Sequence, residues 1–292
     1  MQQLVNTALS GLTLGMVYAA FALALVMIWR STRVVNFAQA PMAMVTTFVA
    51  LAVIDAGHSY WLGFGLALLS GLVLGAVVER VVIRPVEGKP EINAVILTLG
   101  LFIVLHALAS VVFGNRYRSF PAPFGVRGVE VGDTTLGITG FGIFSIAAVL
   151  VVMALLVLLF RVTDLGLRMR AAAYHQEVAR LLGVRVGRML TLGWALASVV
   201  GSLAGLLIAG GSLVHPGFMD SIVVFGFVAA VLGGLDSPVG AVVGGLLLGL
   251  SLSFVSGYVG SQLVALTALA ILMLVLTLRP GGLFSQPAQR RV

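Results

Sequence analysis

The sequence contains no cysteine, a single lysine and little charge of either sign. Only 9% of its 292 residues are charged, whereas 60% are hydrophobic. Because cysteine is absent, disulfides, catalytic thiolates, covalent haem attachment and cysteine-ligated zinc are all excluded. In a typical soluble domain about 25% of the residues are charged. The chain must therefore place much of its surface against a medium other than water.

Motifs for metal binding, catalysis and ATP hydrolysis are missing as well. The four histidines are at positions 58, 106, 175 and 215. They form no H-E-x-x-H spacing, so no metal site is expected. In a phosphate-binding loop a Gly-Lys pair follows an earlier glycine, but here Gly88 and Lys89 are preceded by Ile83 at that position and followed by Pro90. We expect a chain that is not an enzyme, binds no cofactor itself and does not hydrolyse ATP.

Apolar runs long enough to cross a membrane recur along the whole chain. The mean hydropathy is +1.14, and a helix needs roughly 20 apolar residues to cross the hydrocarbon. Dividing the chain at charged and turn residues predicts spans at 4–29, 34–54, 61–78, 92–115, 137–160, 189–211, 220–235, 238–257 and 261–278. We expect an all-α integral membrane protein with one transmembrane domain over 1–292 and about 8–9 helices, some of them broken or short. The number of crossings after residue 215 stays open.

The basic residues predict the orientation of these spans. The net charge is +7, but the arginines are scattered in short connections without a basic face, which argues against nucleic-acid binding. One side of the membrane receives Arg30, Arg33, Arg80, Arg84, Lys89, six arginines between 161 and 188, Arg279, Arg290 and Arg291; the other receives Arg116, Arg118 and Arg127. By the positive-inside rule the N-terminus lies outside and the C-terminus inside. The first run, 4–29, has no basic n-region and is expected to be a retained span.

Ionisable groups are almost absent from the middle of these runs. Only His106 falls inside one, whereas Glu79, Asp220 and Asp236 lie at ends. Transport coupled to protons or sodium usually needs buried carboxylates, so a self-contained secondary transporter is disfavoured. We expect His106 to hydrogen-bond a neighbouring helix, and Asp220 and Asp236, each followed by serine, to be helix N-caps.

Two of the predicted spans are irregular and indicate a substrate path. Pro41 lies within 34–54, and 220–235 is short and bordered by "HPGFMD" and "GGLDSPVG". Freed backbone groups at membrane depth survive only in protein or a watery cavity; a packing kink is the alternative for Pro41. The candidate path residues are Asn6, Asn36, Gln39, Thr46, Asn93 and Thr98. Any of them could instead bond a neighbouring helix; Asn36 and Gln39 are the best pair because they adjoin the irregularity.

Glycines four residues apart indicate close helix packing. The pairs are Gly11 with Gly15, Gly71 with Gly75, Gly201 with Gly205, Gly240 with Gly244, and Gly245 with Gly249. Such pairs let two helix backbones approach. We expect most of them to pack inside this subunit, with a dimer interface as the alternative.

The segment 161–188 is an island of charge with six arginines and two acids. From Tyr174, apolar residues recur at Val178, Leu181 and Leu182 on one helical face, and Gly183 suits the residue that ends a helix. The segment predicts a short amphipathic helix on the basic side. It could lie on anionic membrane lipid, or it could dock into a soluble partner as a lever.

Four stretches of the sequence resemble segments of one known protein family. The run "LRMRAAAYHQEVARLLGVRVGRMLTLGWALASVVGSLAGLL" resembles the cytoplasmic coupling loop and next helix of LivH-type permeases, the membrane subunits of branched-chain amino acid ABC importers. "NTALSGLTLGMVYAAFALALVMIW", "RVVNFAQAPMAMVTTFVA" and "FVAAVLGGLDSPVGAVVGGLLLGL" resemble its first span, its Asn-Phe-Ala segment and its glycine-rich late segment. Nearly the whole chain aligns in order.

The resemblance implies a bacterial inner-membrane importer with several other subunits. These would be a second homologous permease, two cytoplasmic ATPases carrying ATP and Mg, and a periplasmic substrate-binding protein. The coupling loop would be 161–188, and the residues in the coupling role would be Glu177, Arg180, Leu181, Gly183 and Arg185.

One departure from the family leaves the solute open. Where the family usually continues Asn-Phe-Ala with His-Gly and often Glu, this chain has Gln39, Ala40 and Pro41. A related permease for an amide or urea is therefore the alternative.

The segment 115–136 is the longest connection on the other side of the membrane. It is expected to be a periplasmic loop with Arg116, Tyr117 and Arg118 as candidates for docking the binding protein. A plain solvent-exposed connection is the alternative.

Overall fold

The structure, a computed structural model, describes residues 2–125, 127–131 and 134–284. Arg290 and Arg291, which the charge count places on the inner side, lie outside the described residues. So do residue 126 and residues 132–133 of the predicted periplasmic loop.

In the described part of the chain, nine apolar helices match the nine predicted spans. They are α1 (Gln2–Thr32), α2 (Gln39–Asp55), α3 (Tyr60–Val77), α4 (Glu91–Phe113), α5 (Gly140–Val162), α8 (Val186–Ala209), α9 (Asp220–Gly233), α10 (Pro238–Tyr258) and α11 (Val264–Leu278). Seven are long and apolar enough to cross a membrane, counting the turns that extend α3 and α11, whereas α2 and α9 are shorter. The prediction of an all-α polytopic membrane protein is confirmed.

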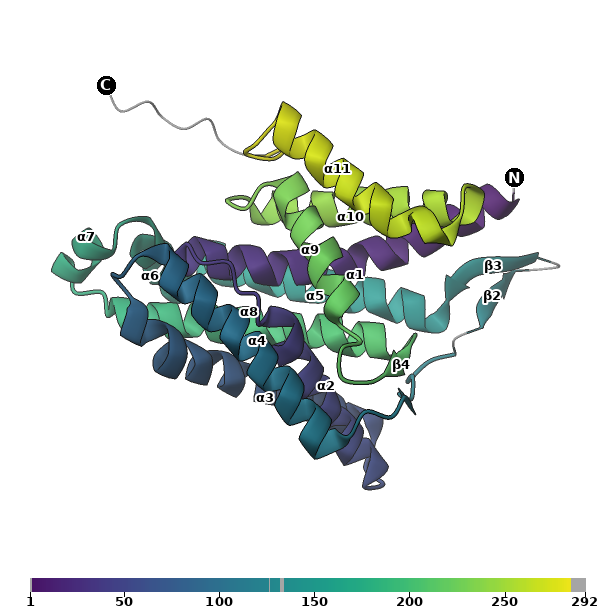
Figure 1. The fold of residues 1–292 in the computed structure, drawn as a ribbon, viewed down its shortest axis with the longest axis horizontal. Coiled ribbons are helices and arrows are strands. Elements are labelled where there is room, and N and C mark those ends of the chain that lie inside the picture. Colours follow the sequence, from purple (N-terminus) through teal and green to yellow (C-terminus); the bar gives the residue numbers. More distant parts are fainter. Residues whose placement is uncertain (1, 126, 132–133, 285–292) are drawn as a thin grey trace.

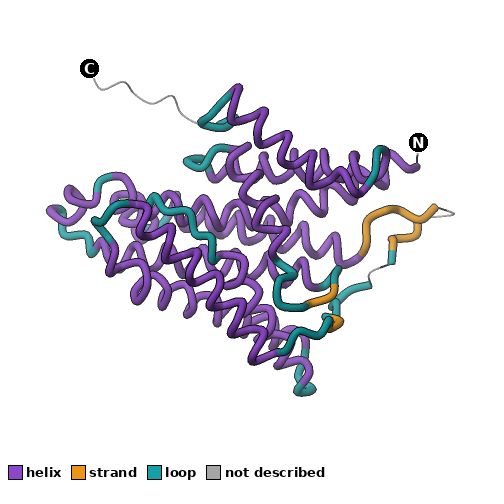
Figure 2. Tube along the Cα trace, viewed as in Figure 1, coloured by secondary structure: helices purple, strands orange, loops and turns teal. Residues whose placement is uncertain are grey.

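The remaining elements lie at the two ends of the helix bundle. The π-helical turn η1 (Val78–Ile83) and the 3-10 turn η2 (Arg84–Val86) extend α3, and η3 (Ser261–Leu263) precedes α11. The short helices α6 (Asp164–Tyr174) and α7 (Gln176–Leu181) lie at one end, the α7 end, and the hairpin of β2 (Gly128–Val131) and β3 (Thr134–Thr139) lies at the other, the hairpin end (Figure 1). Among the described residues, strand occurs only near the hairpin end, where β1 (Arg118–Ser119) pairs antiparallel with β4 (Leu213–Val214) (Figure 2).

Two helices form the inside of the bundle and the others surround them. The apolar stretches of α1 and α8 are 83% and 78% buried, whereas those of α4, α5 and α11 are only 11–17% buried. The outer helices expose large apolar side chains such as Val111 and Met273. Apolar surface of this extent is suited to lipid.

The glycine pairs pack helices inside this one subunit, as predicted. Gly245 and Gly249 of α10 lie against Ala19 and Gly15 of α1. On the other side of the core, Gly75 of α3 lies against the backbone of Trp194 in α8. A side chain at any of these glycines would separate the helices.

The predicted break at Pro41 is wrong in its position. The chain leaves helix at Arg33, whose φ is 57°, and α2 begins only at Gln39. Pro41 therefore lies in the first turn of α2, where a backbone N–H would have no helical partner. The interruption is the segment 33–38, and Pro41 helps to start the helix after it.

Candidate translocation path and coupling site

Asn36 and Gln39 meet where the chain enters α2. Both are buried, with 1% of their surface exposed. The Asn36 amide donates to Gln39 Oε1 at 3.1 Å, and its oxygen accepts from the backbone N–H of Ala38 at 3.0 Å. Gln39 Nε2 donates to the carbonyl of Ala197, in the middle of α8, at 3.2 Å. The interrupted segment thus reaches deep into the bundle and is held there by amide side chains.

The other four predicted path residues do not all join this pair. Thr98 of α4 is buried and donates to Val95 of its own helix, and its hydroxyl lies 3.4 Å from the carbonyl of Val35 in the interrupted segment. Thr46 is buried and bonds Ala43 within α2. Asn93 is half-buried in the first turn of α4. Asn6 lies at the hairpin end, where its oxygen accepts from the N–H of Gly137 at 2.7 Å.

The start of α9 carries an ionisable contact that sequence reasoning did not assign. Nε2 of His106 in α4 lies 3.0 Å from Oδ1 of Asp220 but without hydrogen-bond geometry, and Nδ1 pairs with the carbonyl of Phe102 in its own helix at 3.3 Å. The two side chains are in contact, but the expected hydrogen bond from His106 to a neighbouring helix is not formed. The prediction that Asp220 is an N-cap is wrong, because Met219 holds that position without a side-chain bond. Instead Asp220 lies in the first turn, where a helix dipole favours negative charge. Asp236 pairs with Arg33, and it is Ser237 that caps α10.

The two short helices meet inside the bundle. The N–H of Gly217, just before α9, donates to the sulfur of Met44 in α2 at 3.4 Å. In helical membrane proteins, short helices that begin within the bundle mark the place where polar solutes cross. The amide pair at one end of this region and the His106–Asp220 contact at the other supply its polar side chains.

The charged island forms two helices rather than the single amphipathic helix expected. His175 has extended backbone (φ −145°, ψ 96°), so Tyr174 ends α6 and α7 starts at Gln176. The predicted stop is confirmed: Gly183 has a φ of 81°, and the N–H of Val184 donates back to Ala179 at 2.9 Å. The result is a six-residue helix held between two turns.

Most of the apolar side chains of α7 point away from the rest of the protein. Leu181 is 88% exposed and Leu182 76% exposed. Only Ala179 is buried, in a small cluster with Ala172, Val186 and Leu190. A six-residue helix cannot be stable alone, so this surface is suited to a partner.

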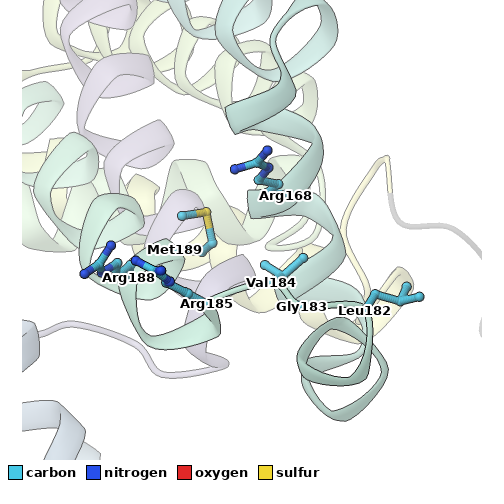
Figure 3. A pocket seen from close by; sticks show the side chains of 7 residues that line it. All are labelled: Arg168, Leu182, Gly183, Val184, Arg185, Arg188 and Met189. Atoms are coloured by element: carbon cyan, nitrogen blue, oxygen red, sulfur yellow. The ribbon is translucent and has the colours of Figure 1, made fainter.

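Arginines surround the turn after α7. A cavity of about 540 Å³ is lined by Arg168 of α6, by the turn with Gly183, and by Arg185 and Arg188 at the start of α8 (Figure 3). All three arginines are exposed, and none of them forms an ion pair within the described part of the chain. This end of the protein therefore presents uncompensated positive charge next to the exposed leucines of α7.

An ion pair at the α7 end was missed from the sequence. Glu79 is the only charged side chain that is buried among those the structure describes, and it binds Arg84. On an α-helix, residues five apart point about 140° away from each other, so an α-helical interpretation does not pair them. The signal that could have found the pair is the string "VVERVVIRP", an acid within a mostly apolar stretch in a chain with so few acids.

The predicted docking residues at the hairpin end differ in what they contact. Arg118 is tied into the protein: it donates to the carbonyl of Phe113 at 2.7 Å and lies 3.8 Å from Asp55. The ring of Tyr117 packs against that of His215 with 4.5 Å between the ring centroids and a tilt of 49°, yet 68% of the residue is exposed. Arg116 is exposed. Arg116 and Tyr117 therefore form the outward surface, and Arg118 supports it.

Comparison with known proteins places the chain in a family. Residues 7–278 match the family model described as the branched-chain amino acid transport system / permease component. The chain belongs to this permease family. The permease is 29% identical over 307 residues to the high-affinity branched-chain amino acid transport system permease protein LivH of Escherichia coli, covering all of this chain and 97% of LivH. It is also 29% identical over 308 residues to BraD of Pseudomonas aeruginosa, described in the same words, with 98% of BraD covered.

A solved structure supports the fold of the permease. PsaBC from Streptococcus pneumoniae in complex with Fab superposes with a TM-score of 0.51 over 96% of this chain and 93% of the matched one. At 16% identity this likeness concerns the fold alone. The permease is thus an integral, multi-pass membrane subunit of a transport system.

Proposed function

We propose that this permease imports branched-chain amino acids across the bacterial inner membrane as one subunit of an ABC importer. The observation that carries the proposal is α7, a six-residue helix with Leu181 and Leu182 exposed at the most basic end of the bundle. Because the described chain contains no phosphate-binding loop, the energy has to come from another polypeptide. The full-length similarity to LivH and BraD supports the solute class.

The partners in this proposal are four chains of three classes. Two cytoplasmic ATPases, which bind ATP and Mg, dock on α7 through Glu177, Arg180, Leu181, Gly183 and Arg185. A second, homologous permease completes the membrane part. A periplasmic binding protein docks at the hairpin end on Arg116 and Tyr117, with Arg118 beneath them. The N-terminus is then periplasmic and the C-terminus cytoplasmic, in agreement with the positive-inside rule.

The route for the solute lies between α2, α4, α8 and α9. A zwitterion in the bundle needs polar partners, because burying its charges without them costs several kcal/mol. The amides of Asn36 and Gln39 and the His106–Asp220 contact are the polar groups on this route. Asn36 and Gln39 bond each other and α8 in this structure, so they would have to release those bonds when solute passes.

The test is purification of the tagged permease from its native membrane with mass spectrometry of the proteins that accompany it. We expect a second permease and ATPases with the wild type, and loss of the ATPases with Glu177→Ala/Arg180→Glu. Arg180 also lies 3.5 Å from Glu87 within the permease, so Glu87→Gln is the matched control, which breaks that pair without altering α7. Recovery of the wild-type chain alone would refute the proposal.

A second candidate function is supported by the neutral residues at the start of α2. Gln39, Ala40 and Pro41 place no titratable group there, which would suit an uncharged amide or urea as well as an amino acid. Competition distinguishes the two: unlabelled leucine, valine or isoleucine should block uptake of labelled leucine, whereas urea and acetamide should not. Uptake by the purified permease without any ATPase would instead indicate a secondary transporter.

A further inference from the structure

Glu79 lies at the junction of three elements at the α7 end. Its carboxylate is 1% exposed and accepts hydrogen bonds from two helices. Arg84, just after η1, donates to both of its oxygens at 2.9 Å, and Thr191 of α8 donates to Oε2 at 2.7 Å. Arg84 also donates to the carbonyl of Gly187, in the first turn of α8, at 2.7 Å. These bonds tie the end of α3 to the start of α8.

The π-helical turn makes this arrangement possible. In η1 the N–H of Arg84 bonds the carbonyl of Glu79, five residues earlier. The wider turn places the side chains of Glu79 and Arg84 on one face of the helix, whereas an α-helix would hold them apart. Irregular turns of this kind inside helices occur frequently at functional sites.

Arg84 also faces the coupling helix. It lines a cavity of about 530 Å³ together with Glu87, which follows η2, His175, which precedes α7, and Glu177 and Arg180 of α7. Arg180 and Glu87 approach to 3.5 Å across this cavity. Arg84 therefore takes part in the buried ion pair with Glu79 and also lies beside α7.

From this point α3 and α8 lead to the interrupted segment. Gly75 of α3 packs on the backbone of Trp194 in α8, so the two helices are in direct contact. About two turns further along α8, Gly201 packs on the side chain of Gln39. A displacement of α3 and α8 together would reach the amide pair at the start of α2.

We propose that Glu79, Arg84 and Thr191 are positioning residues that join the end of α3 to the start of α8, so that movement of α7, which is connected to α8 through the turn at Gly183, displaces those two helices as one body. This proposal rests on the docking role proposed above for α7. A buried ion pair is a weak source of net stability but holds its partners in one geometry, and loss of one partner leaves an uncompensated charge. In this proposal the three residues connect the ATPase-docking surface of α7 mechanically to the solute route.

The first experiment measures the connection itself. Because the chain has no cysteine, Leu181→Cys on α7 and Val73→Cys on the exposed face of α3 can carry two spin labels in the full-length protein. Glu79→Gln/Arg84→Gln removes both charges together, and Thr191→Val removes only the hydroxyl. We expect a narrow distance distribution with Glu79, Arg84 and Thr191 intact, a broader or shifted one in the double variant, and a smaller change in Thr191→Val. Unchanged distributions in both variants would overturn the proposal, whatever α7 binds.

The second experiment measures transport in the reconstituted complex. We expect the double variant to retain ATPases and their hydrolysis but to move about fivefold less solute per ATP, the lower end of typical coupling between linked sites. Asp236→Asn is the matched control, since it removes an acid paired with an arginine at α1 rather than at α3 and α8. A wild-type ratio of solute to ATP in both the double variant and Thr191→Val would overturn the proposal. Failure of the intact protein to bind ATPases would refute the proposed function instead, and the distance measurement would still decide whether the connection exists.

Discussion

Gly249 of α10 lies directly against Gly15 of α1, with the two backbones in contact. A side chain at Gly249 would also meet the carbonyl of Gly11 at 2.9 Å. The inner helix α1 is thus positioned by the absence of side chains on its neighbour. This contact gives the first prediction.

Gly249→Leu should destabilise the fold, because α1 and α10 would have to separate. Overpacking a closely packed site typically costs about 1–3 kcal/mol. The measurement is the temperature at which the detergent-solubilised protein loses its monodisperse peak in size-exclusion chromatography. Gly100→Leu in α4 is the control, since nothing lies within 4 Å of that position. An equal loss of thermal stability in Gly249→Leu and Gly100→Leu would mean that the α1–α10 contact does not require a glycine at position 249.

Leu181→Ser should weaken the binding of a cytoplasmic partner without affecting the fold. The side chain is 88% exposed and contributes little to the permease itself. Truncating a central apolar anchor of an interface costs about 2 kcal/mol or more. Recovery of ATPases with the tagged permease measures the effect, and Leu278→Ser, at the end of α11 and 70% exposed, is the matched control. If the two variants retain the ATPases equally, α7 is not the docking surface.

Asn36→Leu should lower stability as well as uptake. The change leaves the N–H of Ala38 and the Oε1 of Gln39 without their partner, and each buried unsatisfied group costs about 1–3 kcal/mol. Thr46→Val is the comparison, because the Thr46 hydroxyl bonds only a carbonyl of its own helix. Thermal stability and solute uptake should be measured on the same preparations. Wild-type stability of Asn36→Leu would show that the amide network is not needed to hold the interrupted segment.

Arg116→Glu should raise the concentration of binding protein needed for half-maximal transport. Arg116 is exposed, so the change acts on the surface charge at the hairpin end. Charges at the rim of an interface chiefly affect association, and salt screens them. The defect should therefore shrink as salt is raised. Arg118→Ala should behave differently, with a loss of stability, because Arg118 supports the connection through Phe113. A defect of Arg116→Glu that does not depend on salt would argue against electrostatic docking.

Much of the fold could be predicted because a membrane imposes simple rules on sequence. Each apolar run must be a helix, since backbone groups in hydrocarbon need partners within their own segment. The predicted spans 61–78 and 238–257 accordingly differ from α3 and α10 by a residue or so at each end. The expectation that the glycine pairs pack inside one subunit is confirmed, because the helices they lie against belong to the same chain.

The errors concern places where a local pattern has two physical outcomes. Proline ends a helix in its interior but is tolerated in its first turn, so Pro41 alone did not locate the interruption. Asp220 resembles an N-cap in sequence, yet it lies one position inside α9 and faces His106 from another helix. In both cases the decision depends on where the helix begins, which a single sequence gives only approximately.

The sequence by itself determined the class of this protein: a polytopic helical membrane protein, its apolar spans and the charged segment that stands outside them. These follow from composition and periodicity, because the free energy of transferring a segment from water to hydrocarbon depends on the residues of that segment alone. The tertiary structure decided which polar groups meet. Glu79 and Arg84, five residues apart on an irregular turn, meet Thr191 from a distant part of the chain, and Gln39 bonds the carbonyl of Ala197 across the bundle. Such contacts depend on how helices pack and on one irregular turn, and no local pattern encodes them.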